Sequence, residues 1–74
     1  LEEVAVPAGS PVEGKTLRAT QIREFTGALI LALRNPDGEF VSNPAPEQPI
    51  TAGDVLIAIG TSAELVELGR LVGG

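Results

Sequence analysis

Residues 28–42 read ALILALRNPDGEFVS, and this stretch predicts a β-hairpin. The apolar run from Ala28 to Leu33 is short for a helix and is bounded by a glycine and a turn. It therefore predicts a strand covered on both faces. Residues 35–38, Asn-Pro-Asp-Gly, carry the residue types that a type I turn favours at its four positions. Residues 39–42 then predict the returning strand.

Two further strands are predicted outside the hairpin. Residues 3–6 alternate polar and apolar side chains up to Pro7, which predicts a half-buried strand. Residues 55–59 are wholly apolar and follow a tight turn at residues 52–54, so they predict a buried strand. Between the hairpin and this strand, residues 43–49 hold three prolines, whose missing N–H groups exclude a central strand and indicate an extended surface crossover.

Two helices complete the predicted order. A short helix is expected to begin at Lys15 and end at Gly27, with an irregular spacing that indicates a break near Thr20. Its expected inward residues are Leu17, Ala19, Ile22 and Phe25. The second helix begins at a capping box, in which Thr61 caps the first turn and Glu64 reaches back. Its apolar face is expected to hold Leu65, Leu68, Leu71 and Val72.

The resulting order is strand, helix, strand, strand, strand, helix, which predicts a small α+β domain. Helices are expected to pack on a mainly antiparallel sheet, with residues 1–74 forming a single domain. A chain of 74 residues buries a limited core, and without cysteine or histidine it has neither disulfides nor a typical zinc site. We therefore expect oligomerisation, or attachment to a larger protein of which this chain is a fragment.

The composition disfavours several classes of partner. The net charge is −5, the five cations are scattered and only two residues are aromatic, which argues against nucleic-acid binding. The longest apolar runs are far too short to span a bilayer, so no direct membrane insertion is expected. The absence of cysteine is compatible with the cytoplasm.

Residues 9–16, GSPVEGKT, match the phosphate-binding loop pattern G-x-x-x-x-G-K-[ST]. Two residues contradict the chemistry of that loop, because Pro11 has no N–H to donate and the Glu13 carboxylate would repel phosphate. No Walker-type acidic residue follows a strand beyond the loop either, so we do not expect a nucleotide hydrolase. Ser10 and Asp54 also have no neighbouring base or acid to work with, so no enzymatic activity is expected.

The predicted strands, turns and helix starts follow one another in a specific order and at specific spacings. This set of signals consists of residues 1–6, 10–17, 28–34, the turn at 37–38, the exit at 43–44, and residues 50–57 and 60–61. This set resembles the TrkA-C domain, also called the C-terminal RCK domain, of potassium-uptake and potassium-channel regulators. The resemblance covers essentially the whole chain. In such domains the stretch from Ser10 to Leu17 links the first strand to the first helix.

The resemblance implies a non-enzymatic regulatory role on the cytoplasmic side of a potassium or other cation transport protein. It also implies pairing into homodimers, and contact with a membrane channel or transporter subunit of the parent protein. Several members bind cyclic di-AMP at the dimer interface, and others have no known ligand, so cyclic di-AMP is a candidate regulatory ligand. The chain has no G-x-G-x-x-G pattern, and we assign it no cofactor of its own.

In relatives that bind cyclic di-AMP, the ligand contacts the hairpin region. The candidate ligand-binding residues here are Leu29, Ile30, Arg34, Asn35 and Pro44. They would form an apolar floor with a polar edge, on which Arg34 pairs with a phosphate and Asn35 hydrogen-bonds a base or ribose. In the alternative interpretation Leu29 and Ile30 are core residues, Asn35 starts the turn and Arg34 is solvated.

Two alternative functions stay open. The first is a purely structural dimerisation module of a permease or antiporter, without a ligand. The second is a lipoyl- or biotinyl-like carrier domain, suggested by the short strands and the run from Val6 to Lys15. A carrier needs its modified lysine at a hairpin tip, whereas Lys15 precedes a helical segment.

A homodimer is expected on physical grounds as well. The chain is short, has no covalent staple and has a positive mean hydropathy, so it is expected to leave apolar surface outside its core. The expected interface lies around the hairpin and the first helix, where Ile22, Phe25 and Phe40 offer apolar area.

Overall fold

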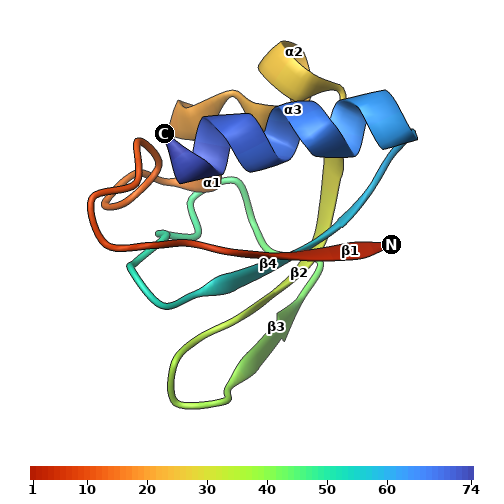
Figure 1. Cartoon of the computed structure of the whole chain (residues 1–74). Helices are drawn as coiled ribbons and strands as arrows, with labels where there is room; N and C mark the ends of the chain where they lie inside the picture. The colour runs from red at the N-terminus through yellow and green to blue at the C-terminus, as the bar shows by residue number, and fades with distance from the viewer.

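Four antiparallel strands form a sheet that carries helices on one of its faces (Figure 1). The computed structural model describes residues 1–74. The strands are β1 (Glu2–Ala5), β2 (Leu29–Arg34), β3 (Phe40–Ser42) and β4 (Val55–Ile59), and the helices are α1 (Leu17–Thr20), α2 (Ile22–Thr26) and α3 (Ser62–Gly73). The predicted α+β class and element order are confirmed, with the first helix split into α1 and α2.

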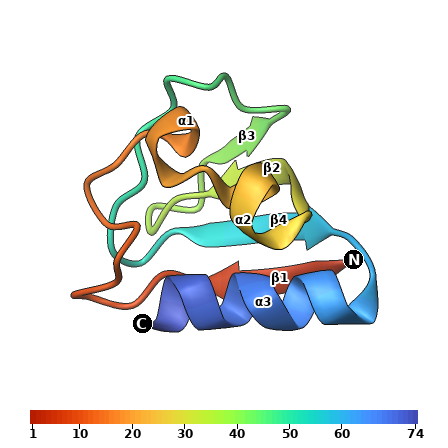
Figure 2. The same cartoon turned by 90° about the horizontal axis from the view of Figure 1, so that it is seen from above.

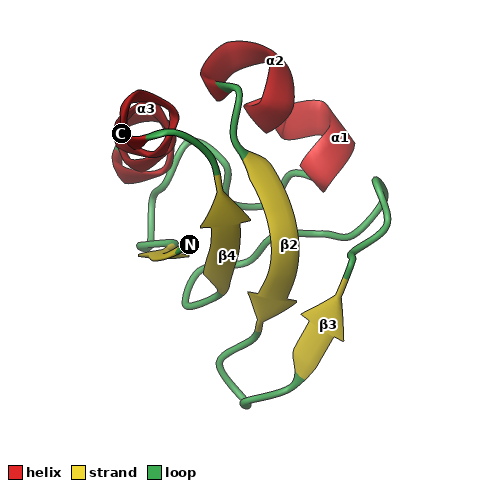
Figure 3. Cartoon of the chain, turned by 90° about the vertical axis from the view of Figure 1, so that its right-hand side faces the viewer, coloured by secondary structure: helices red, strands yellow, loops and turns green.

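The strand order in the sheet is β1-β4-β2-β3. Val4 of β1 lies opposite Leu56 of β4, and Leu33 of β2 lies opposite the same Leu56. Paired residues of an antiparallel sheet point to one face, so these three side chains share the face that the helices cover. Figure 3 shows the curved sheet with the helices gathered on one side of it.

The predicted hairpin between β2 and β3 is confirmed. The Gly38 N–H donates to the Asn35 carbonyl oxygen at 2.9 Å and closes the four-residue turn. The Asn35 side chain organises this turn, because its Oδ1 accepts from the N–H groups of Asp37 and Glu39 and its Nδ2 donates to Glu39 Oε1. Gly38 has a φ of +88°, a left-handed conformation that glycine adopts readily.

The strand boundaries agree with the predictions to within one residue, but the predicted cover of the apolar strands does not. Leu29 and Leu31 of β2 are 46% and 38% exposed, and Ile59 of β4 is 45% exposed. β2 also carries a bulge between Ile30 and Ala32. The prediction of strands covered on both faces is wrong because the helices lie on one face only.

Gln21 separates α1 from α2 in a left-handed conformation with a φ of 51°. The break falls one residue after the predicted position. Ile22 beyond it is buried and Leu17 before it packs against the core, as expected. Phe25 is 67% exposed and Ala19 is also exposed, so their predicted inward orientation is wrong. The left-handed residue interrupts the helical phase, and a continuous-helix pattern fails across it.

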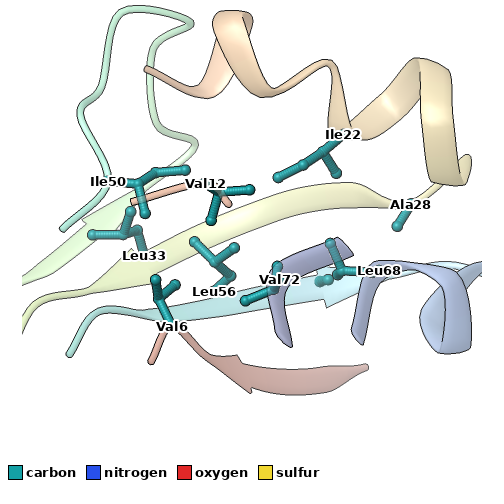
Figure 4. Packing of buried hydrophobic residues seen from close by; sticks show 10 residues of the cluster. Val6, Val12, Ile22, Ala28, Leu33, Ile50, Leu56, Leu68 and Val72 are labelled. Atoms are coloured by element: carbon teal, nitrogen blue, oxygen red, sulfur yellow. The ribbon is translucent and has the colours of Figure 1, made fainter. Parts of the chain in front are cut away.

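The core fills the space between the sheet and the helices (Figure 4). Leu33 and Leu56 from the sheet belong to one buried cluster with Leu68 and Val72 from α3, and each of the four is at most 1% exposed. The predicted apolar face of α3 is therefore confirmed. The remaining core residues are Val6, Val12, Ile22, Ala28, Ile50 and Ala58.

The capping box of α3 is also confirmed. The Glu64 N–H donates to Thr61 Oγ1 at 3.1 Å, and the Thr61 N–H donates to Glu64 Oε1 at 2.8 Å. The Glu64 side chain lies against Gly27 at the end of α2 and against Gly60, where an added Cβ would meet it. One carboxylate thus starts α3 and packs against the end of α2.

The loop between β1 and α1 is anchored to distant parts of the chain. Ser10 Oγ donates to the Val72 carbonyl oxygen at 2.6 Å, across 62 positions. The Gly14 N–H donates to the Ile50 carbonyl oxygen at 2.8 Å. Thr16 Oγ1 then accepts from the Ala19 N–H and caps α1. The loop therefore holds both α3 and the segment before β4 in place.

Candidate functional site

A groove of about 270 Å³ is lined by residues of α1, α2, the start of β2 and the segment after β3. Figure 2 shows α1 lying beside the segment that follows β3, and α2 lying above β2. We call this groove the α1–β2 groove. Its lining residues are Leu17, Arg18, Ile22, Arg23, Glu24, Ala28, Leu29, Ile30, Pro44 and Pro46. Small-molecule pockets usually enclose about 300–1,000 Å³. A large ligand would therefore need a second surface to cover it.

Local backbone features build this groove. The N–H groups of Leu17 and Arg18 donate to the carbonyl oxygens of Gln48 and Pro46 at 3.0 and 2.9 Å. These bonds tie the segment after β3 to the first turn of α1. Gly27, with a φ of 81°, ends α2 and leads directly into β2. Main-chain hydrogen bonds thus hold α1 against the segment after β3, and α2 is joined to β2 by a short connection.

The floor of the groove is apolar and its rim is charged. Arg18 pairs with Glu47 outside the groove, with Nη1 and Oε2 3.1 Å apart, and both side chains are more than two-thirds exposed. Arg23 takes part in no ion pair, and Glu24 is the one acid in the lining. The rim therefore presents two cations against one anion, in a chain whose net charge is −5.

Three of the five predicted ligand residues meet in the α1–β2 groove. Leu29, Ile30 and Pro44 line it, and they come from β2 and from the segment after β3. Leu29 is 46% exposed and Ile30 is half-buried, so their side chains are not enclosed in the core. The structure thus brings together the predicted apolar floor.

Arg34 and Asn35 lie outside the groove. Arg34 Nη2 is 3.1 Å from Glu3 Oε1, and the Asn35 side chain is engaged in the turn. Leu29 and Arg34 mark the two ends of β2, about 16 Å apart at roughly 3.3 Å per residue. Within one copy, the predicted apolar floor and the predicted polar edge are therefore separated.

Arg18 and Arg23 are groove residues that the sequence reasoning missed. In the sequence they are two of five scattered cations. On a continuous helix two residues five positions apart would point about 140° away from each other. The left-handed Gln21 between them removes that relation, and both arginines line the same groove.

The second notable surface is the face of the sheet that no helix covers. The register places Leu29 opposite Ile59, Ala32 opposite Ile57, and Arg34 opposite Phe40. We define the uncovered sheet face by its large apolar residues, which are Leu29, Phe40, Ile57 and Ile59. Leu29, Phe40 and Ile59 are each at least 45% exposed. Leu29 belongs both to this face and to the α1–β2 groove.

The other residues considered for chemistry have structural roles. Asp54 is 2% exposed, and its carboxylate accepts from the Thr51 N–H and from Thr51 Oγ1 at 2.8 and 3.1 Å. It holds the turn before β4. The Gly9 N–H donates to Glu13 Oε1 at 2.6 Å, so a carboxylate of the loop occupies an amide that a phosphate would need. Lys15 lies just before the four-residue helix α1 rather than at a hairpin tip.

The comparison with protein families identifies the domain. The family model described as the TrkA-C domain matches residues 1–73. The chain belongs to the TrkA-C family. This family consists of regulatory domains of potassium channels and transporters, so the predicted resemblance is confirmed.

A curated relative of this TrkA-C domain is potassium channel protein 1 of Methanocaldococcus jannaschii. The two are 40% identical over 63 residues, which cover 85% of this chain and 19% of the relative. The chain thus spans about a fifth of the length of that channel protein. None of the helices of the TrkA-C domain described here has the length and apolar character needed to cross a membrane.

Two solved structures share the fold of this TrkA-C domain. The RCK_C domain dimer of S. agalactiae BusR in complex with c-di-AMP has a TM-score of 0.90 and 25% identity, covering 97% of this chain and 93% of that chain. The RCK C domain of the potassium transport protein KtrA in complex with c-di-AMP has a TM-score of 0.83 and 26% identity, covering 93% and 78%. BusR has also been solved with its busA-promotor DNA, where this chain covers 36% of that chain.

Proposed function

We propose that this chain is the cytoplasmic regulatory domain of a potassium or other cation transport protein, and that it senses cyclic di-AMP as a homodimer. The observation that carries the proposal is the α1–β2 groove. It gathers Leu29, Ile30 and Pro44 in a fold whose solved neighbours BusR and KtrA hold c-di-AMP. The potassium channel relative supports the transport role of the parent protein.

Dimerisation is supported by the uncovered sheet face. Its exposed apolar side chains are Leu29 and Ile59 at one end of β2 and Phe40, opposite Arg34, at the other end, and a two-fold axis could use the same face on both copies. The interface expected from the sequence included Ile22, but Ile22 is 3% exposed and belongs to the core. Phe25 lies on α2 and Phe40 on the sheet, so the helical and sheet surfaces offer separate apolar areas.

A shared ligand site follows from the position of Leu29, which belongs to both the groove and the uncovered sheet face. Pairing through that face would place a second copy beside the groove and add to its limited volume. In this arrangement Arg34 and Asn35 would reach the ligand from the partner copy. Their separation from the groove within one copy is consistent with a site completed by two copies.

The low number of cations favours a small anionic ligand over nucleic acid. The chain has five basic and ten acidic residues, and only two of the basic ones line the groove. Duplex binding usually requires a broad positive surface. We therefore propose that this domain does not itself contact nucleic acid.

Calorimetric titration of the chain with cyclic di-AMP tests the ligand, and sedimentation equilibrium with and without ligand tests the dimer. We expect saturable heat at micromolar concentration, with one ligand per two chains. A dimer without heat at high micromolar ligand would favour the alternative, a purely structural dimerisation module. A monomer without heat would contradict both functions.

A further inference from the structure

We propose that Arg23, assisted by Arg18, anchors the phosphate of the ligand in the α1–β2 groove. The choice of cyclic di-AMP as that ligand rests on the proposed function, but the assignment of a phosphate-bearing nucleotide rests on the groove itself. Arg23 thereby becomes a ligand-positioning residue that neither the sequence pattern nor the candidate ligand set included.

Arg23 is the arginine of this chain that is free to bind an anion. Arg18, Arg34 and Arg70 each form an ion pair with a glutamate, whereas Arg23 forms none. It is exposed and lines the groove directly. A guanidinium offers several donors in a planar arrangement that matches two phosphate oxygens. Binding of a phosphate by Arg23 would therefore break no existing ion pair.

Arg18 adds a second cation to the same groove. The left-handed Gln21 between α1 and α2 allows both arginines to line one groove. The Glu47 partner of Arg18 lies outside the groove lining, and their pair is largely solvent-exposed, so it competes weakly with a phosphate. The lining therefore holds two arginines and one glutamate, in a chain whose net charge is −5.

The remaining lining explains why the ligand should be a nucleotide rather than a free phosphate. Leu17, Leu29, Ile30 and Pro44 offer apolar contacts beside the two arginines. A base or ribose can rest against this floor while its phosphate faces the charged rim. Inorganic phosphate would gain only the charged contact and should bind more weakly.

The test is calorimetric titration of wild type, Arg23→Ala, Arg23→Lys and Arg18→Ala with cyclic di-AMP, cyclic di-GMP, AMP and inorganic phosphate. The matched control is Arg70→Ala, which removes another exposed arginine, from α3 and outside the groove lining. Circular dichroism and thermal unfolding check that each variant is folded. We expect Arg23→Ala to weaken cyclic di-AMP binding by at least about tenfold, because it removes a charge-assisted bond. Arg23→Lys should restore part of the affinity, and Arg70→Ala should match wild type.

The outcomes separate this inference from the proposed function. If cyclic di-AMP binds wild type and Arg23→Ala equally, the phosphate anchor is overturned while the ligand assignment stands. If another phosphate-bearing nucleotide binds in an Arg23-dependent way and cyclic di-AMP does not, the anchor stands and the ligand assignment fails. If none of the phosphate compounds binds wild type, both are overturned.

Discussion

Arg34 and Glu3 form an ion pair across the central strand β4, with Arg34 Nη2 and Glu3 Oε1 3.1 Å apart. Arg34 comes from β2 and Glu3 from β1, and β4 lies between these strands. The register puts both side chains on the uncovered sheet face, where Glu3 lies opposite Ile57. The side chains are 39% and 62% exposed, so the pair contributes at most about 1 kcal/mol to stability.

This pair lowers the expected contribution of Arg34 to ligand binding. We expect Arg34→Ala to weaken cyclic di-AMP binding by less than about tenfold, and by less than Arg23→Ala, because Arg34 must leave Glu3 to meet a phosphate. Glu3→Gln should tighten binding slightly by releasing Arg34. Calorimetric titration of the three variants measures the order. A larger loss for Arg34→Ala than for Arg23→Ala would contradict it.

The central position of β4 predicts a large effect of Leu56→Ala. Leu56 is fully buried between β1 and β2, and its truncation should destabilise the domain by about 2–5 kcal/mol. Urea unfolding followed by circular dichroism measures the change. The control is Val66→Ala on α3, whose side chain is 54% exposed, and we expect it to change stability by less than about 0.5 kcal/mol. A loss below 0.5 kcal/mol for Leu56→Ala would show that the site tolerates a cavity.

Dimerisation through the uncovered sheet face predicts a specific effect of Ile59→Glu. The new carboxylate would have to be buried without a partner in the interface, so this variant should sediment as a monomer of about 7.6 kDa. Val66→Glu adds the same charge on α3 and should leave the dimer intact. Sedimentation equilibrium over a tenfold concentration range measures both. Monomeric wild type, or a dimer broken by Val66→Glu alone, would place the interface elsewhere.

Gly27 should tolerate substitution less well than Gly38. Its φ is +81°, and an added Cβ would meet the Glu64 carboxylate that caps α3. Gly38 has a similar φ of +88°, but a Cβ added there would have no atom within 4 Å. Gly38→Ala therefore measures the backbone strain alone, about 1–2 kcal/mol. We expect Gly27→Ala to destabilise the domain by more than Gly38→Ala in thermal or urea unfolding. Equal losses would show that Glu64 moves aside freely.

Local signals were sufficient for the elements whose geometry depends on neighbouring residues. The Asn35–Gly38 turn, the Thr61–Glu64 capping box and the strand at residues 55–59 each carry their information within a few positions. The TrkA-C resemblance supplied the apolar part of the candidate site. It placed Leu29 and Pro44 together, and the structure brings both into one groove.

The features that sequence reasoning missed depend on distant residues or on an unusual backbone. An apolar strand has the same pattern whether a helix or a second copy covers it, so the uncovered sheet face could not be recognised. Gln21 adopts a positive φ without being glycine. The spacing of a continuous helix therefore does not predict the directions in which Arg23 and Phe25 point. The partner of Arg34 is 31 positions away on a strand that is not adjacent to its own.

The hydrogen bond from Ser10 to the Val72 carbonyl joins the two ends of the chain, and β1 pairs with β4 over a similar separation. Such long-range contacts stabilise the domain only after a large loop-closure entropy has been overcome. The domain is therefore expected to fold more slowly than a helical bundle. During synthesis, a chain that lacks α3 cannot cover Leu56 with Leu68 and Val72. The domain is therefore expected to fold in one step only after its last helix has emerged, and to expose its sheet to other chains until then.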